Sequence, residues 1–303
     1  MELSLWILPI LIAKLLIYIG VSAAVGGVFV SYLIPDNTAV RRPVKLYICL
    51  FLSFALISTV LDFFLQVGVF SERGISGMWD SDIASILWSS NVGDVALYRF
   101  TGFVIALVAL VTRDFLIRRE CFSVSKKMML ASVHFSAAVL LVSSFRLVGH
   151  TAEMAIIFHY LISLHVFVAA WWMGALWPLW LLCRVGPGPL LQPLMIRFGQ
   201  YAVVFVSILL ICGGILAMQL ISSISDLIST TYGQLIVAKL FAVVVILLVA
   251  IRHKFRLVPK LLDGGNAVKA LSRSIEIEML VGLGIFLITV VFTNVVGPEH
   301  AMR

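Results

Sequence analysis

Long apolar stretches alternate with short polar gaps along nearly the whole chain, and this pattern limits the folds that the chain can adopt. Hydrophobic residues make up 62% of the 303 residues and charged residues only 12%, whereas a soluble domain is about half apolar and a quarter charged. A helix of about 20 apolar residues crosses the roughly 30 Å hydrocarbon core of a bilayer and satisfies its own backbone there. The sequence therefore predicts an all-α, polytopic integral membrane protein with about eight transmembrane helices.

The apolar stretches define the predicted spans and leave no gap large enough for a separate domain. The spans cover residues 5–34, 45–69, 96–116, 128–148, 154–182, 199–222, 234–252 and 275–296. We therefore expect a single integral-membrane domain over residues 1–303. The longest gap, near residues 70–95, contains Trp79 and Trp88 at a spacing that predicts a short amphipathic helix on the membrane surface.

Basic residues collect in every second gap, and this bias predicts the topology. Most of the 22 Lys and Arg residues lie in the first, third, fifth and seventh gaps, whereas the other gaps are mainly acidic. Because cytoplasmic loops carry an excess of Lys and Arg, both termini are expected on the periplasmic side. The net charge of +7 then reflects contact with anionic membrane lipids and no nucleic acid.

Several ionisable residues fall inside the predicted spans, where a charge facing lipid is costly. We expect Lys14, Asp62 or Lys239 to face the interior of the bundle, and Asp62 and Lys239 to be able to pair. Glu276 and Glu278 are interpreted as a solvated cap at the start of the last span, because negative charge favours a helix N-terminus.

The turn after the fourth span carries the residues best suited to a metal. His150 lies at its mouth, Met154 follows, and His165 lies inside the fifth span. Imidazole binds copper, zinc and iron, and thioether sulfur prefers Cu(I), so we expect His150, Met154 and His165 to be metal ligands. His150 precedes the fifth span and His165 lies about eleven residues inside it, a drop of about 15 Å at helical rise, so they require two sites or a relay.

The fifth predicted span and the segment after it resemble the CopD/PcoD family of bacterial copper-resistance inner-membrane proteins. The resemblance rests on Gly149-His150, Leu164-His165, Trp171-Trp172-Met173-Gly174, Gly213-Gly214, Tyr232-Gly233-Gln234-Leu235 with Lys239, Arg252, Glu278 and Pro298. The copper-resistance D domain of that family would cover residues 195–298. The resemblance implies a copper-binding protein of the bacterial inner membrane that is not an enzyme. It also implies copper transport or resistance beside a periplasmic copper-binding partner of the CopC type, with His150 and His165 matching the histidines of the family.

Two other functions remain open at the level of the sequence. A b-type haem protein, acting as an electron carrier or a metal reductase, would use histidines on facing helices, and His134 and His165 lie on adjacent spans. A scaffold that only docks a periplasmic copper protein, with no ion passing through, is the third possibility.

Overall fold

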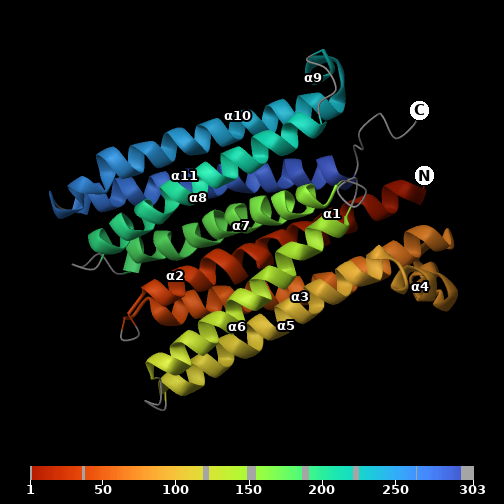
Figure 1. Ribbon diagram of the computed structural model, residues 1–303, viewed down its shortest axis with the longest axis horizontal. Helices are drawn as coiled ribbons and strands as arrows, with labels where there is room; N and C mark the ends of the chain where they lie inside the picture. The colour runs from red at the N-terminus through yellow and green to blue at the C-terminus, as the bar shows by residue number, and fades with distance from the viewer. Residues whose placement is uncertain are drawn as a thin grey trace.

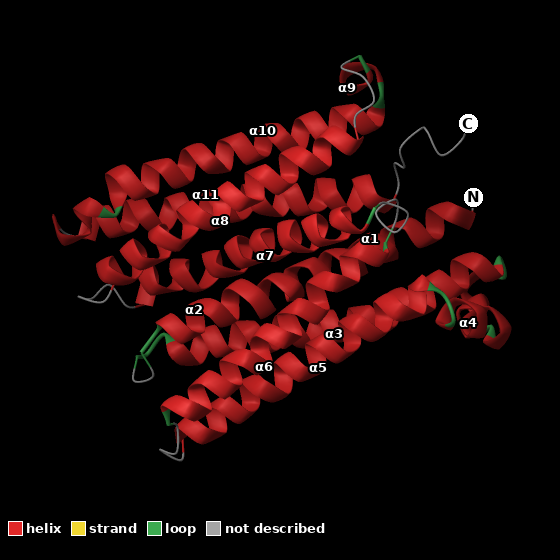
Figure 2. Ribbon diagram, viewed as in Figure 1, coloured by secondary structure: helices red, strands yellow, loops and turns green. Residues whose placement is uncertain are grey.

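A computed structural model describes the chain over residues 2–35, 38–118, 123–148, 155–185, 191–220, 225–263 and 265–294. Within these ranges every regular element is a helix, and Figure 2 shows no strand. Eight helices in this part of the chain are long and apolar enough to cross a membrane. The predicted all-α architecture and its number of spans are therefore confirmed.

The first four spans form one group of helices, here called the front group (Figure 1). Its elements are α1 (Glu2–Ser22), the π-helical turn η1 (Ala23–Gly27), α2 (Val28–Leu33), α3 (Arg41–Ser71), the 3-10 turn η2 (Gly74–Trp79), α4 (Ser81–Trp88), α5 (Asn91–Arg118), α6 (Val124–Ser143) and the 3-10 turn η3 (Ser144–Leu147). α1, η1 and α2 follow one another within a single span. α3 contacts both α1 and α5, and α6 packs on α5.

The last three spans form the rear group, which lies on the other side of the fifth span in Figure 1. Its elements are α8 (Leu191–Leu220), α9 (Asp226–Ser229), α10 (Thr231–Arg252), the π-helical turn η5 (His253–Leu257), the 3-10 turn η6 (Pro259–Asp263) and α11 (Gly265–Asn294). α10 packs on α11, and α11 also reaches α1. The rear group is therefore joined to the front group through α11.

The fifth span, α7 (Ile156–Val185), lies between the two groups. It contacts η1, α1 and α6 on one side and α8 and α11 on the other. In its most apolar window 67% of the residues are buried, against 11% in α8 and in α10. Polar side chains on α7 are therefore the ones most enclosed by protein.

Glycines allow α7 to approach the first span at backbone distance. A Cβ atom added to Gly174 would lie 1.7 Å from the carbonyl oxygen of Ser22, and one added to Gly26 would lie 2.1 Å from that of Trp171. No side chain fits in either place, so small residues are required on both helices. We call this contact of Gly26 with Gly174 the glycine seam.

Two predicted spans begin later than the helices that contain them. α8 begins at Leu191 instead of residue 199, and α11 begins at Gly265 instead of residue 275. Both helices start with polar or basic residues, such as Lys269 and Arg273 in α11, which a hydropathy window excludes. Helix formation continues through them because the backbone still makes its i to i−4 hydrogen bonds in the headgroup region.

The predicted short helix in the longest gap is confirmed as α4. Asp80 caps it, since its Oδ1 accepts hydrogen bonds from the backbone N–H groups of Asp82 and Ile83 at 3.1 and 3.2 Å. Trp79 and Trp88 are 73% and 56% exposed, as expected for indoles at the level of the headgroups.

The two ends of the bundle differ in charge. Figure 1 shows that the first residues of α1, the last residues of α11 and α4 lie at one end, here called the terminal end. The other end, here called the basic end, carries Arg41, Lys45, Arg184 and Lys254 near the helix termini. The first described residues of α1 and the last described residues of α11 therefore lie at the same end of the bundle.

Candidate functional site

The structure describes one of the three predicted metal ligands. His150 and Met154 lie outside the described residues, whereas His165 lies on α7. Among the described residues no three His, Cys, Asp or Glu side chains are close enough together to hold a metal ion. The candidate site is therefore built around His165 and the other polar groups on α7.

The imidazole of His165 packs against α8. A Cβ atom on Gly213 would lie 3.0 Å from Cε1 and 3.3 Å from Nδ1 of His165, so the glycine makes room for the ring. Nδ1 is buried, and although the Leu209 carbonyl lies nearby, the two make no hydrogen bond of good geometry. A buried imidazole nitrogen in this condition has a lone pair or a proton available for a ligand.

Lys239 on α10 lies close enough to act on His165 electrostatically. It makes no hydrogen bond or ion pair with any residue that the structure describes. The predicted possibility of a pair with Asp62 is wrong, because Asp62 lies in the front group and contacts Arg99 of α5 at 3.7 Å. Lys239 thus lies beside His165, and its ammonium form would oppose a cation there.

The front group holds its charges in a paired network near the terminal end. Asp62 is 4% exposed and lies against Arg99, whose Nε donates to Ser144 at 3.1 Å. Lys14 donates to the side chain of Asn294 on α11. The prediction that at least one of Lys14, Asp62 and Lys239 faces the interior is confirmed by Asp62.

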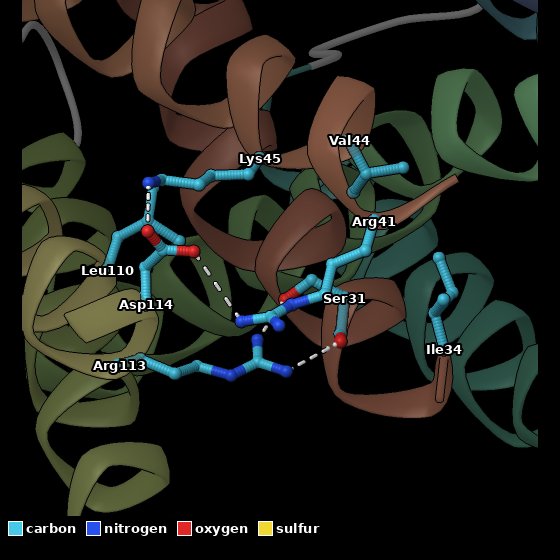
Figure 3. Close-up of a pocket in the computed structure, with 8 residues that line it drawn as sticks. All are labelled: Ser31, Ile34, Arg41, Val44, Lys45, Leu110, Arg113 and Asp114. Atoms are coloured by element: carbon cyan, nitrogen blue, oxygen red, sulfur yellow. Dashed lines mark hydrogen bonds and ion pairs between the residues drawn. The ribbon is translucent and has the colours of Figure 1, made fainter. Parts of the chain in front are cut away.

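A second paired cluster lies at the basic end of the front group (Figure 3). Arg113 of α5 donates to the hydroxyl and carbonyl oxygens of Ser31 at 2.7 and 2.9 Å, and Lys45 pairs with Asp114 at 2.7 Å. A cavity of about 20 Å³ lies among these residues, enough for about one water molecule. The cluster ties α2, α3 and α5 together.

The structure gives the two histidines of the haem hypothesis different neighbours. His134 on α6 is 4% exposed, and its Nδ1 lies 2.8 Å from the Leu130 carbonyl oxygen and 3.2 Å from the Tyr32 hydroxyl. It therefore faces the front group, whereas His165 faces α8. This arrangement does not bring the two rings toward a common ligand.

The four residues of the motif Trp171-Trp172-Met173-Gly174 have different neighbours. Trp171 is 2% exposed and stacks on Phe198 of α8, with 4.8 Å between ring centroids. Gly174 forms the glycine seam. Trp171 and Gly174 therefore serve packing.

Met173 lines a cavity that sequence reasoning did not predict. The cavity is open toward the surface of the bundle, has a volume of about 180 Å³ and lies between α1, α3, α7 and α11, with Met279 on its α11 side. Gly282 makes room for the side chain of Met173, since a Cβ atom on Gly282 would lie 2.5 Å from the sulfur of Met173. The two methionines are far apart in sequence, and only the packing of α7 on α11 makes them neighbours of one cavity.

Glu278 is not the solvated cap that the sequence suggested. α11 begins at Gly265, so Glu278 lies well inside the helix, and it is 2% exposed. Its Oε1 lies 3.3 Å from Nδ1 of His253, and the indole of Trp172 is a hydrogen-bond neighbour. Sequence reasoning missed His253, whose only signal was its place beside Arg252 in the stretch that resembles the CopD family.

Glu276 is not a free cap either. It accepts hydrogen bonds from Trp180 and from Arg184, both at 2.7 Å. Arg184 also donates to Ser272 at 3.1 Å. These contacts fix the end of α7 against α11 at the basic end.

Comparison with known proteins identifies one part of the chain. Residues 192–292 match the family model of copper resistance protein D, CopD, close to the predicted boundaries of 195 and 298. Searches of curated proteins and of solved structures gave no match. The matched residues include Gly213 and Lys239 beside His165, and also His253 and Glu278. The resemblance of this chain to the CopD family of copper-resistance membrane proteins is therefore confirmed over residues 192–292.

Proposed function

We propose that this chain binds copper and moves it across the bacterial inner membrane, in a single domain over residues 1–303. The observation that carries the proposal is the CopD match over residues 192–292, together with the position of His165 against the matched helix α8. In this proposal both termini are periplasmic, a CopC-type protein delivers the copper, and the chain performs no enzymatic reaction.

His150 and Met154 receive the ion at the terminal end in this proposal, and His165 receives it inside the membrane. A mixed imidazole and thioether mouth suits copper better than zinc. Met173 and Met279, which line the cavity further along α7, supply two more soft sulfur atoms in the same direction.

The charge of Lys239 supports passage over storage. A conducting site must hold its ion weakly enough to release it, and a cation beside His165 lowers the affinity for copper there. A protein built to store copper would gain by placing an anion at this position.

The test uses purified protein in detergent and in liposomes. His150→Ala should weaken copper binding at the mouth, whereas His165→Ala should leave the mouth occupied and impair copper uptake into the liposomes. His159→Ala is the matched control, because His159 lies on the same helix and is not a proposed ligand.

The outcome separates the three hypotheses. A Soret band in the purified protein would favour the haem protein. If His150→Ala and His165→Ala both bind copper and support copper-dependent growth as the unaltered chain does, the histidines are structural and the docking scaffold becomes the better description. A reporter fused after Arg303 that is active only in the cytoplasm would overturn the proposed topology.

A further inference from the structure

Two glutamates two positions apart on α11 have opposite environments. The side chain of Glu276 is 34% exposed and pairs with Arg184 at 2.7 Å. The side chain of Glu278 is 3% exposed and faces Nδ1 of His253 at 3.3 Å. One helix thus provides a surface ion pair and a buried carboxyl–imidazole pair.

His253 lies between the buried carboxyl and the basic end of the bundle. It is the first residue of the π-helical turn η5, and its chain neighbours Arg252 and Lys254 are exposed. Its own side chain is 13% exposed. Turns of π-helix are often found at functional sites, and this one holds an imidazole where protein interior meets the polar surface.

Two buried polar atoms of the Glu278–His253 pair lack hydrogen bonds of good geometry. Oε1 of Glu278 and Nε2 of His253 are both buried and make no hydrogen bond of good geometry. A pair retained only for packing would be expected to satisfy these atoms, since an unsatisfied buried polar group costs free energy. Carboxyl and imidazole groups inside membrane proteins commonly form proton relays.

The groups that the structure describes around Glu278 and His253 offer no other site for a proton that is exchanged between them. α7 contributes the indole N–H of Trp172, which carries no charge, and α10 contributes the cation Arg252, which acts on His253. A buried carboxyl is stable when it is protonated or when it faces an imidazolium, and it is costly otherwise. A proton shared between Glu278 and His253 satisfies both conditions in turn.

We propose that Glu278 and His253 form a proton-transfer pair that moves protons between the interior of the bundle and its basic end. The proton leaves Oε1 of Glu278 and binds Nδ1 of His253, which makes the ring an imidazolium. The ring then turns so that Nδ1 releases this proton to water at the basic end, and the neutral ring, still protonated on Nε2, turns back. Glu278 is reprotonated from the interior, so that one proton is moved in each cycle. The link between this transfer and copper movement rests on the proposed function.

The experiment compares Glu278→Gln with Glu276→Gln in liposomes that contain a pH-sensitive dye. Copper is added outside, and the dye signal and copper uptake are recorded together. Glu278→Gln should lower the rate of proton movement by about 100-fold, within the range that one positioned acid–base group contributes. Glu276→Gln should keep the rate of the unaltered chain, because its carboxyl serves only a surface pair.

A second variant and an infrared measurement keep the test decisive if Glu278→Gln does not fold. His253→Gln leaves the carboxyl in place but removes its proton acceptor, so proton movement should fall as strongly. A pH-difference infrared spectrum of the unaltered chain should contain a protonated carboxylic acid band, which Glu276→Gln retains.

The results distinguish this inference from the proposed function. Copper uptake without proton movement, or proton movement that survives both Glu278→Gln and His253→Gln, overturns the proton-transfer pair and leaves copper transport standing. If the unaltered chain moves protons through Glu278 but takes up no copper, the pair stands and the proposed function falls. If it moves neither ion, both fall.

Discussion

The front and rear groups differ in how their cations inside the bundle are paired. In the front group Arg99 faces Asp62 and Ser144, and Arg113 donates two hydrogen bonds to Ser31. In the rear group Lys239 of α10 has no partner among the described residues. On the neighbouring helix α7, Nδ1 of His165 makes no hydrogen bond of good geometry. Paired charges hold helices in place, whereas incompletely paired groups remain able to bind an ion.

The two groups also differ in how much of each helix is enclosed by protein. In each front-group span 39% of the most apolar window is buried, against 11% in α8 and α10. The glycine seam brings α7 to backbone contact with the front group. We infer that the front group and α7 form the rigid part of the molecule, against which α8 and α10 enclose the polar residues of the candidate site.

The largest expected effect comes from breaking a front-group pair. Asp62→Leu leaves Arg99 buried without its anion, and removal of one partner of a buried pair costs about 3–5 kcal/mol. The melting temperature of the purified protein in detergent should fall strongly, whereas Asp82→Ala on the surface helix α4 should leave it unchanged.

The double variant Asp62→Leu with Arg99→Met checks the cause of this effect. It should recover most of the lost stability, because a matched apolar pair removes the unpaired charge. Equal melting temperatures for Asp62→Leu and the unaltered chain would show that the front-group pair does not hold the helices, and the contrast with the rear group would disappear.

The sequence predicted the spans and an interior position for at least one of Lys14, Asp62 and Lys239, because both predictions follow from the cost of polar groups in lipid. It did not predict that Asp62 faces Arg99 instead of Lys239, since that choice depends on α3 packing on α5. Glu278 was misassigned for a similar reason: the polar start of α11 hid how far inside the helix it lies. The cavity shared by Met173 and Met279 likewise depends on a helix contact that no local pattern encodes.

A smaller effect is expected at the glycine seam. Gly174→Ala places a Cβ atom 1.7 Å from the Ser22 carbonyl oxygen, and overpacking of this kind costs about 1–3 kcal/mol because two backbones must move apart. Gly214→Ala is the matched control, since no atom lies within 4 Å of its added Cβ. That change should be neutral or stabilise the rear group by up to about 1 kcal/mol, as alanine is the better helix former.

Thermal unfolding of the two alanine variants measures this difference directly. A loss of stability in Gly214→Ala as large as that in Gly174→Ala would mean that α8 is packed as tightly as the seam. The division into a rigid front and a loosely packed rear would then be wrong.

The smallest expected effect is a gain in stability, opposite in sign to the loss expected for Asp62→Leu. A lysine at the centre of a membrane helix costs about 2.5–3.5 kcal/mol, and Lys239 has no partner among the described residues to offset this cost. Lys239 lies toward the terminal end of α10 and away from the centre of the span Thr231–Leu257, so the cost there is smaller. Lys239→Met should therefore stabilise the chain by about 1 kcal/mol and tighten copper binding at His165, because a repulsive charge is removed. Thermal unfolding and copper titration of the same preparation measure the two effects. If Lys239→Met destabilises the chain as Asp62→Leu does, Lys239 is paired as firmly as the front-group charges, and the two halves of the bundle follow one rule.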